Sequence, residues 1–153
     1  MRAVVMRVKH ASVTIDGRVN GAIGQGLLIL LGVAPTDTPA LCDKLAEKAL
    51  GLRIFCDENG KMNRSLADVG GQVLVVSQFT LFADCKKGNR PSFTLSAAPD
   101  EANRLYELFC SELSANGVGN VEKGIFGADM AVDIANDGPV TIVLDTDIWR
   151  KDK

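Results

Sequence analysis

The spacing of apolar residues predicts a strand, a hairpin and a buried strand in the N-terminal part of the chain. Apolar and polar positions alternate weakly over residues 2–8, which is typical of a strand with one buried face. Residues 12–23 flank Asp16-Gly17, a pair that favours a two-residue hairpin turn because both positions tolerate a positive φ. The continuous apolar run 26–34 has strand length and predicts a strand buried on both faces.

Two amphipathic helices are predicted from apolar residues that recur every three or four positions. Asp37 or Thr38 can cap the first helix, and Pro39 suits its first turn. The second helix runs from about 99 to 114, and Gly117 can close it. The two apolar stripes are Leu41, Leu45, Ala49 and Leu52 in the first helix, and Ala102, Leu105, Tyr106, Phe109 and Leu113 in the second.

Strands outnumber helices in the rest of the chain, and most links between strands are short. This pattern favours one α+β domain over residues 1–153, with a mainly antiparallel, barrel-like sheet and about two peripheral helices. Disorder is one alternative for the tail after about residue 146. The remaining predicted strands cover residues 52–56, 72–83, 119–126, 128–136 and 140–146, the last two being joined by a turn at "NDGP".

Composition places the chain among ordinary soluble globular proteins. Of its 153 residues, 46% are hydrophobic and 24% are charged. No apolar stretch reaches the roughly 18–20 residues that span a membrane, and the N-terminus has no secretory pattern, so a cytoplasmic protein is expected. His10 is the single histidine, and the four cysteines are far apart, so a zinc site is not expected. Most thiols are expected to be buried and reduced; they are Cys42, Cys56, Cys85 and Cys110.

The net charge of −2 argues against broad binding of nucleic acid, but one loop is basic. Lys86, Lys87 and Arg90 follow one another closely between residues 84 and 93, and Arg150, Lys151 and Lys153 lie in the tail. A local patch that contacts RNA is one interpretation of these cations. A solvated loop and tail are the other.

Familiar catalytic motifs are absent, and two polar stretches remain as candidates. The chain has no P-loop, no dinucleotide-binding glycine pattern and no G-x-S-x-G elbow, and His10 alone does not predict a catalytic base. Ser77 and Gln78 interrupt an apolar run, where an unpaired polar group costs about 1–3 kcal/mol. They therefore find partners at a strand end or face a pocket. In "NDGPVT", the bond before Pro139 can be cis at a cost of about 0.5–1 kcal/mol, although an ordinary trans turn is the simpler interpretation.

The motifs "SQFTLFAD", "GNRPSF" and "NDGPVT" together closely resemble the D-aminoacyl-tRNA deacylase family, also called the D-tyrosyl-tRNA deacylase family. The likeness extends to "LRIFCDENGKMN" and to most of the chain before Asp145. It implies a cytosolic homodimer with a barrel-like antiparallel fold and no metal or other cofactor. The implied reaction is hydrolysis of the ester between a D-amino acid, or glycine, and the terminal adenosine of tRNA.

The same resemblance implies which residues form the site. The pocket would lie at the dimer interface, with Ser77 at its mouth and backbone N–H groups beside Gln78, Phe79 and Thr80 receiving the oxyanion. Thr80 would attack or orient the substrate, and the ribose 2′-OH would help to activate water. The other residues with implied roles are Gly138 and Pro139, in cis from the second subunit, as the chiral filter; Arg7 as their support; Phe126 and Met130 in the adenosine pocket; and Lys86, Lys87 and Arg90 on the tRNA acceptor stem.

Two alternatives remain beside this hydrolase. One is an enzyme of the same fold that removes an L-amino acid from a wrong tRNA, which would require a trans Gly138–Pro139 bond and a roomier pocket. The other is a dimeric binding module without catalytic activity. The intact set of Ser77, Gln78, Thr80 and the Gly-Pro pair favours the D-specific hydrolase.

Overall fold

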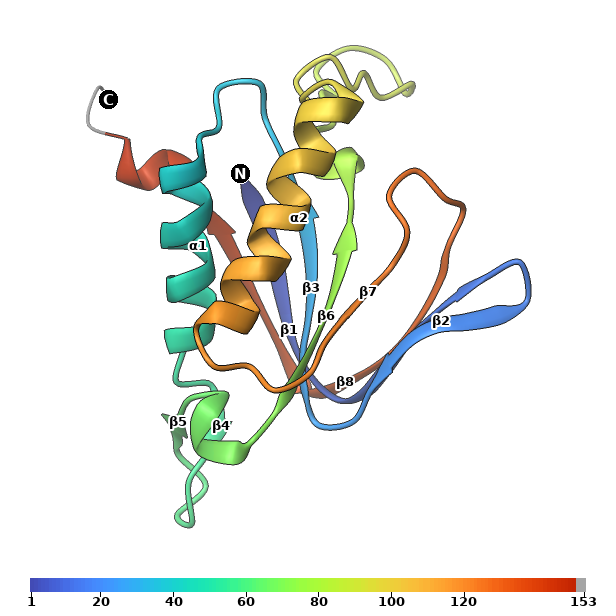
Figure 1. Cartoon of the computed structure of the whole chain (residues 1–153). Coiled ribbons are helices and arrows are strands. Elements are labelled where there is room, and N and C mark those ends of the chain that lie inside the picture. The colour runs from blue at the N-terminus through green and yellow to red at the C-terminus, as the bar shows by residue number, and fades with distance from the viewer. Residues whose placement is uncertain (151–153) are drawn as a thin grey trace.

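The computed structural model, which describes residues 1–150, contains one curled six-stranded sheet and two main helices (Figure 1). The sheet order is β2-β1-β3-β6-β7, and β8 pairs with the free edge of β1. The strands of this sheet are β1 (Arg2–Ile15), β2 (Arg18–Ile23), β3 (Gly26–Gly32), β6 (Gln72–Ser77), β7 (Val121–Lys123) and β8 (Ala131–Asp145). The other elements are α1 (Pro39–Gly51), α2 (Pro99–Ala115), the small hairpin β4 (Phe55–Cys56) and β5 (Met62–Arg64), and the 3₁₀ helices η1 (Ala67–Val69), η2 (Phe79–Phe82) and η3 (Thr146–Trp149).

Strand β1 organises the sheet because it is long enough to pair with three other strands. Its first half is antiparallel to β3 and its second half to β2, while β8 runs antiparallel to it over almost its whole length. The ladders β3–β6 and β6–β7 are parallel. The predicted α+β class is confirmed, and the Asp16-Gly17 turn joins β1 to β2 with a positive φ at both residues. The strand predicted over 2–8 is not separate from the hairpin predicted over 12–23, because β1 runs from Arg2 to Ile15 and also forms the first arm of that hairpin.

The predicted turn at "NDGP" is also wrong, because residues 131–145 form one strand. β8 is held on both sides of this sequence by the continuous strand β1, which local sequence cannot reveal. Met6 pairs with Thr141 and Val8 with Asn136, so Asp137–Val140 bulges out of the ladder opposite Arg7. The predicted strand 119–126 is shortened to β7.

The strand predicted over residues 72–83 ends at Ser77, and the chain then turns into η2. Gln78 N–H donates to Leu31 O at 2.8 Å, which is the last backbone bond to β3. Gly32 lets η2 cross this end of β3, since a Cβ there would lie 3.1 Å from both Gln78 O and the Phe82 ring. Of the strand predicted over 52–56, only β4 forms, paired with β5.

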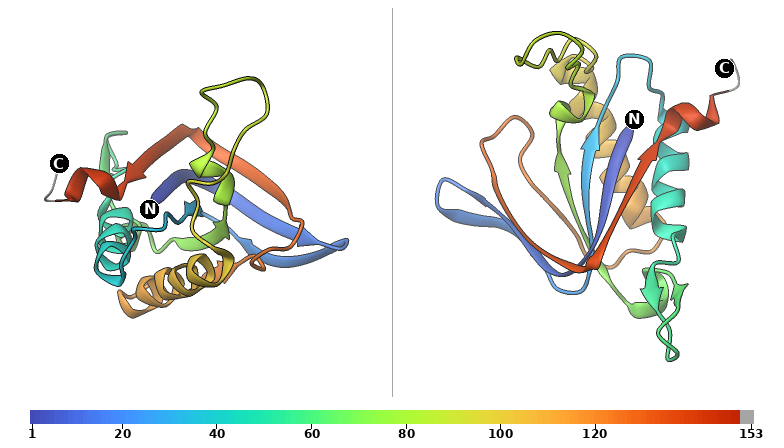
Figure 2. Two further views of the ribbon diagram at one scale, coloured as in Figure 1. Left: turned by 90° about the horizontal axis from the view of Figure 1, so that it is seen from above. Right: turned by 180° about the vertical axis from the view of Figure 1, so that it is seen from behind.

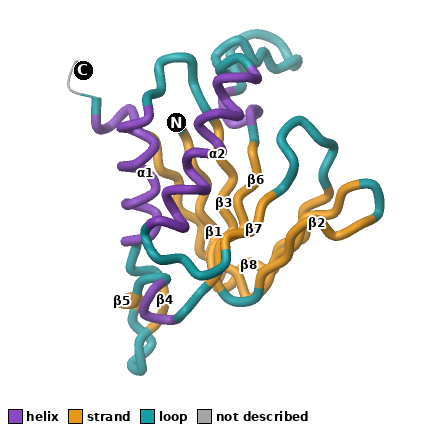
Figure 3. The backbone as a smooth tube through the Cα atoms, viewed as in Figure 1, coloured by secondary structure: helices purple, strands orange, loops and turns teal. Residues whose placement is uncertain are grey.

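Both helices cover one face of the sheet, as Figures 2 and 3 show. Thr38 Oγ1 accepts the Leu41 N–H as N-cap of α1, and all five residues of the predicted α2 stripe are buried. The stripe of α1 is shifted, because Leu41 and Leu52 are only partly buried. Its buried residues are Cys42, Leu45, Ala46 and Ala49. No helix within residues 1–150 is long and apolar enough to cross a membrane.

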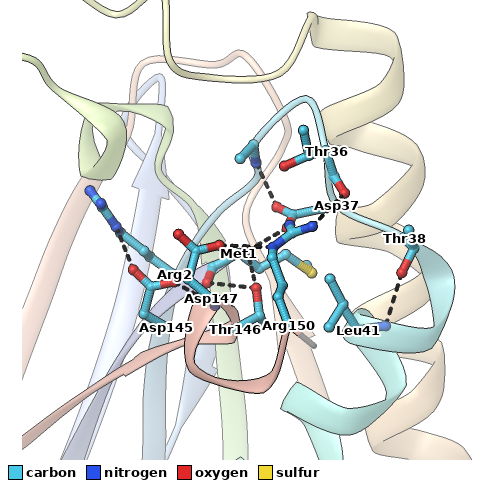
Figure 4. Close-up of polar contacts among 11 residues, drawn as sticks. Met1, Arg2, Thr36, Asp37, Thr38, Leu41, Asp145, Thr146, Asp147 and Arg150 are labelled. Carbon is cyan, nitrogen blue, oxygen red and sulfur yellow. Dashed lines mark hydrogen bonds and ion pairs between the residues drawn. The ribbon is translucent and has the colours of Figure 1, made fainter. Parts of the chain in front are cut away.

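A buried polar cluster joins the two ends of the described chain (Figure 4). The Met1 ammonium lies 2.6 Å from Asp37 Oδ1 and also donates to Thr146 Oγ1. Arg150 Nη2 lies 2.8 Å from the same carboxylate oxygen. The tail is therefore folded through Arg150, and η3 lies beside α1, where Lys44 Nζ is 5.2 Å from the Trp149 ring centroid. Lys151 and Lys153 lie outside the described residues.

Candidate active site

The end of β6 shows why Ser77 and Gln78 interrupt an apolar run. Both side chains are only partly buried, at the point where the chain leaves the sheet. The Gln78 side-chain amide donates to Thr80 Oγ1, which fixes this hydroxyl at the exposed start of η2. Thr80 keeps its own hydroxyl proton for donation to another group. No histidine or carboxylate among residues 1–150 is hydrogen-bonded to this hydroxyl.

The backbone at the start of η2 provides unpaired hydrogen-bond donors. Phe79 and Thr80 open the helix, so their N–H groups have no acceptor within it. Neither group finds another acceptor among residues 1–150. Gln78 N–H differs from them, because it is already bonded to Leu31 O. Of the three expected oxyanion donors, the structure therefore leaves two available, those of Phe79 and Thr80.

A mostly apolar cavity of about 580 Å³ lies beside this segment, and its wall includes Ser77, Gln78 and Phe79 but not Thr80. Phe79 packs edge-on against Phe93, with ring centroids 5.1 Å apart. Phe126, whose centroid is 6.3 Å from that of Tyr106, forms another part of the wall. Apolar side chains that line the cavity include Val33, Val76, Phe79, Phe93, Phe126 and Met130. The cavity is thus lined by both segments that were predicted to form it, residues 77–79 and the segment with Phe126 and Met130.

The Gly138–Pro139 segment does not line this cavity, although its peptide bond is cis as the resemblance implies. Both residues are exposed. Arg7 holds the start of the segment, because its Nε donates to Asp137 O at 3.0 Å and lies 3.4 Å from Asp137 Oδ2. Arg7 is only 8% exposed, and its Nη1 donates to Ile54 O at 2.7 Å. Within one copy of the chain, the structure therefore does not bring the two predicted halves of the site together.

The cysteines and the histidine do not contribute a reactive centre to the cavity. Burial raises the pKa values of Cys42 and Cys110 to about 12, so both remain thiols at neutral pH. Cys56 and Cys85 are exposed, so the expectation that most thiols are buried holds for only two of four. No three His, Cys, Asp or Glu side chains within residues 1–150 cluster as a metal site.

The basic loop directly follows η2. Asp84 and Ser92 pair across its base, and the side chains of Lys86, Lys87 and Arg90 between them are exposed. None of these three cations forms an ion pair with a residue in the range 1–150. Unneutralised cations near the cavity can bind a polyanion.

Sequence reasoning missed several residues that the structure places at these segments. Phe93 belongs to the motif "GNRPSF", but of the 84–93 loop only the three cations had a predicted role. Asn136 and Thr141 lie in the two strands predicted on either side of a turn and had no predicted role, whereas their side chains are hydrogen-bonded to each other across the bulge, with Asn136 Nδ2 and Thr141 Oγ1 2.9 Å apart. The only signal in the sequence was their presence on either side of "DGPV".

Comparisons with known proteins cover almost the whole chain. A family model described as D-Tyr-tRNA(Tyr) deacylase matches residues 4–145. A D-aminoacyl-tRNA deacylase of Deinococcus deserti is 58% identical over 145 residues, covering 95% of this chain and 99% of the relative. One of Roseiflexus castenholzii is 58% identical over 151 residues, covering 99% of this chain and 96% of the relative.

Two solved structures share the fold. One, described as c-Myc DNA Unwinding Element Binding Protein, has a TM-score of 0.89 and 43% identity over 95% of this chain and 98% of its own. The other, a probable eukaryotic D-amino acid tRNA deacylase, has a TM-score of 0.82 over 94% of this chain and 97% of its own. At 17% identity, the second likeness concerns the fold alone.

Proposed function

Because this chain belongs to the D-Tyr-tRNA(Tyr) deacylase family, we propose that it hydrolyses the ester between a D-amino acid and the terminal adenosine of tRNA. Glycine attached to the wrong tRNA is a second substrate in this proposal, and the cytoplasm is its place of action. The observation that carries the proposal is the pair of unbonded N–H groups of Phe79 and Thr80 beside a mostly apolar cavity. The cavity has room for the adenosine next to the reacting ester.

The chemistry requires placement and charge stabilisation rather than a strong base in the protein. Water adds to the ester carbonyl carbon, and the N–H groups of Phe79 and Thr80 donate to the oxyanion that forms. The intermediate then collapses, the bond to the ribose 3′-oxygen breaks, and that oxygen takes up the proton that the attacking water has lost. In this scheme the neighbouring ribose 2′-OH assists the water, and Thr80 orients the ester. Thr80 is a weak candidate for the nucleophile because no base is bonded to it.

The proposed active site is shared between two copies of the chain. Gly138 and Pro139 are exposed and lie outside the cavity of their own chain, which leaves them available to a partner copy. Val143, on the same strand, is apolar and 67% exposed, which supports an interface along β8. Main-chain carbonyls from the Gly-Pro segment would then crowd the space of an L side chain and accept a bond from the substrate amine. A D side chain, pointing the other way, would be accepted in many sizes.

Deacylation of D-Tyr-tRNA, Gly-tRNA and L-Tyr-tRNA tests the proposed specificity. We expect rapid hydrolysis of the first, measurable hydrolysis of the second because glycine has no side chain to clash, and release of L-tyrosine at the rate in buffer. A preference for L-Ala-tRNA over D-Ala-tRNA would instead favour the L-clearing alternative. No turnover of any of them would favour the binding module.

Replacement of Lys86, Lys87 and Arg90 by alanine should raise KM for D-Tyr-tRNA and flatten its dependence on salt. Each phosphate contact that is lost reduces the number of counterions released on binding, whereas the reacting ester is untouched. We expect KM to rise about tenfold at low salt with kcat changed by less than about twofold. Kinetics from 50 to 300 mM KCl measure this, about the range in which screening acts. Identical KM values for variant and wild type at every salt concentration would mean that the loop is merely solvated.

A further inference from the structure

The side chains of Asn136 and Thr141 bridge the two ends of the bulge in β8, and this bridge is called the neck of the bulge. β8 is paired with β1 at Asn136, opposite Val8, and again at Thr141, opposite Met6. The four residues between them, Asp137–Val140, leave the ladder and carry Gly138 and Pro139 outward.

Asn136 bonds to the returning side of this bulge through both ends of its amide. Its Oδ1 accepts the Val140 N–H at 3.1 Å, and its Nδ2 donates to Thr141 Oγ1 at 2.9 Å. These two bonds replace pairing that the main chain loses when it departs from β1. The neck is thereby closed by side chains rather than by the backbone ladder.

Arg7 and Asn136 act on opposite sides of the Gly-Pro segment. Arg7 bonds to Asp137 O before Gly138, whereas Asn136 bonds to Val140 N–H after Pro139. Each side of the dipeptide is thus tied to a separate side chain. Arg7 is also bound to Ile54 O in the interior, so its loss would disturb the fold as well as the bulge. Thr141 is exposed and Asn136 is only partly buried, so removal of this pair should leave the fold in place.

We infer that Asn136 and Thr141 are positioning residues that fix the Gly138–Pro139 main chain and so set the ratio of D to L hydrolysis. This inference rests on the proposed function, because it assigns the dipeptide the role of chiral filter. A filter made of main-chain carbonyls discriminates only if its atoms are held in one place, since a shift of about 1 Å can cost a hundredfold in rate. Asn136 and Thr141 supply that restraint without contacting the substrate.

The test uses N136A, T141V and T141S, with the double variant N136A/T141V. N136A removes both bonds, and T141V replaces the acceptor hydroxyl by a methyl group of similar shape. T141S keeps the hydroxyl and is the matched control. We expect N136A and T141V to lower kcat on D-Tyr-tRNA and to raise the L/D ratio of kcat/KM by about tenfold, with KM little changed. T141S should remain near wild type.

The double variant shows whether Asn136 and Thr141 act together or independently of each other. Because both residues close one neck, N136A/T141V should be no more than about twofold worse than N136A alone. Melting temperatures within a few degrees of wild type would show that the fold is retained. An unchanged L/D ratio in folded N136A and T141V, or an equal loss in T141S and T141V, would overturn the inference.

Amide hydrogen exchange at Val140 gives a readout that does not depend on catalysis. Its N–H is bonded to Asn136, so exchange should become at least about tenfold faster in N136A, while that of buried Val5 stays the same. If wild type fails to hydrolyse D-Tyr-tRNA but Val140 responds in this way, the proposed function is contradicted, whereas the restraint of the bulge by Asn136 is supported. Unchanged Val140 exchange in N136A would overturn the restraint itself.

Discussion

Replacing Gly138 by alanine should lower kcat/KM for D-Tyr-tRNA by about a hundredfold while the protein stays folded. Gly138 has a φ of +126°, which L side chains rarely adopt. A Cβ added there would lie 2.9 Å from Arg7 Nη2 and 2.9 Å from Val140 Cγ2. Either the bulge or the two contacted side chains must therefore shift, which disturbs the support that Arg7 gives to this segment. Since Gly138 and Pro139 themselves are exposed, the displacement should affect the site more than the stability.

Gly17→Ala is the matched control for this variant. Gly17 also has a positive φ, +77°, but nothing lies within 4 Å of an added Cβ. Both alanines would sit at a positive φ, but only at Gly138 does the added Cβ meet Arg7 and Val140. Single-turnover deacylation by the two variants, alongside their melting temperatures, makes the comparison. Wild-type kinetics in a folded Gly138→Ala protein would show that the position of this segment does not matter for catalysis.

Replacing Asp37 by asparagine should lower the free energy of unfolding by about 3 kcal/mol. Its side chain is fully buried and lies 2.6 Å from the Met1 ammonium and 2.8 Å from Arg150 Nη2. It also accepts the Ala34 N–H at 2.6 Å. An asparagine of the same shape keeps hydrogen-bonding atoms but leaves the fully buried Met1 ammonium without a counter-charge, whereas Arg150 keeps its ion pair with Asp147.

Urea unfolding at pH 7 measures this loss, and Glu58→Gln provides the contrast. The ion pair of Glu58 with Arg64 lies at the surface, with side chains 74% and 44% exposed, so its loss should move the unfolding midpoint much less than the loss of Asp37 does. If Asp37→Asn and Glu58→Gln shift the unfolding midpoint equally, the buried cluster does not stabilise the fold as described.

The sequence predicted well those elements whose pattern of apolar residues is complete within one segment of the chain. The stripe of α2 from Ala102 to Leu113 follows from helical spacing alone, and every member is buried. β8 was divided in two because "NDGP" has the composition of a turn. Its continuity depends on β1, more than a hundred residues earlier, which pairs on both sides of the bulge. Local propensity cannot contain that information.

The candidate site was predictable to a similar extent. The polar residues Ser77 and Gln78 indicated a strand end or a pocket, and both interpretations apply. Roles implied by resemblance could not show that Gln78 N–H is already bonded to Leu31 O. Asn136 and Thr141 were missed because they act only once the register of β8 on β1 separates them by a bulge.

In the proposed dimer, each active site takes residues 77–80 from one subunit and Gly138–Pro139 from the other. The decisive measurement combines two impaired variants in one dimer, Gln78→Ala/Thr80→Ala in one subunit and Gly138→Ala in the other. One of the two sites in such a heterodimer is then intact, and the other carries both defects. Heterodimers purified through two different affinity tags should hydrolyse D-Tyr-tRNA at about half the wild-type rate. A heterodimer no more active than the two parent variants would contradict a shared site.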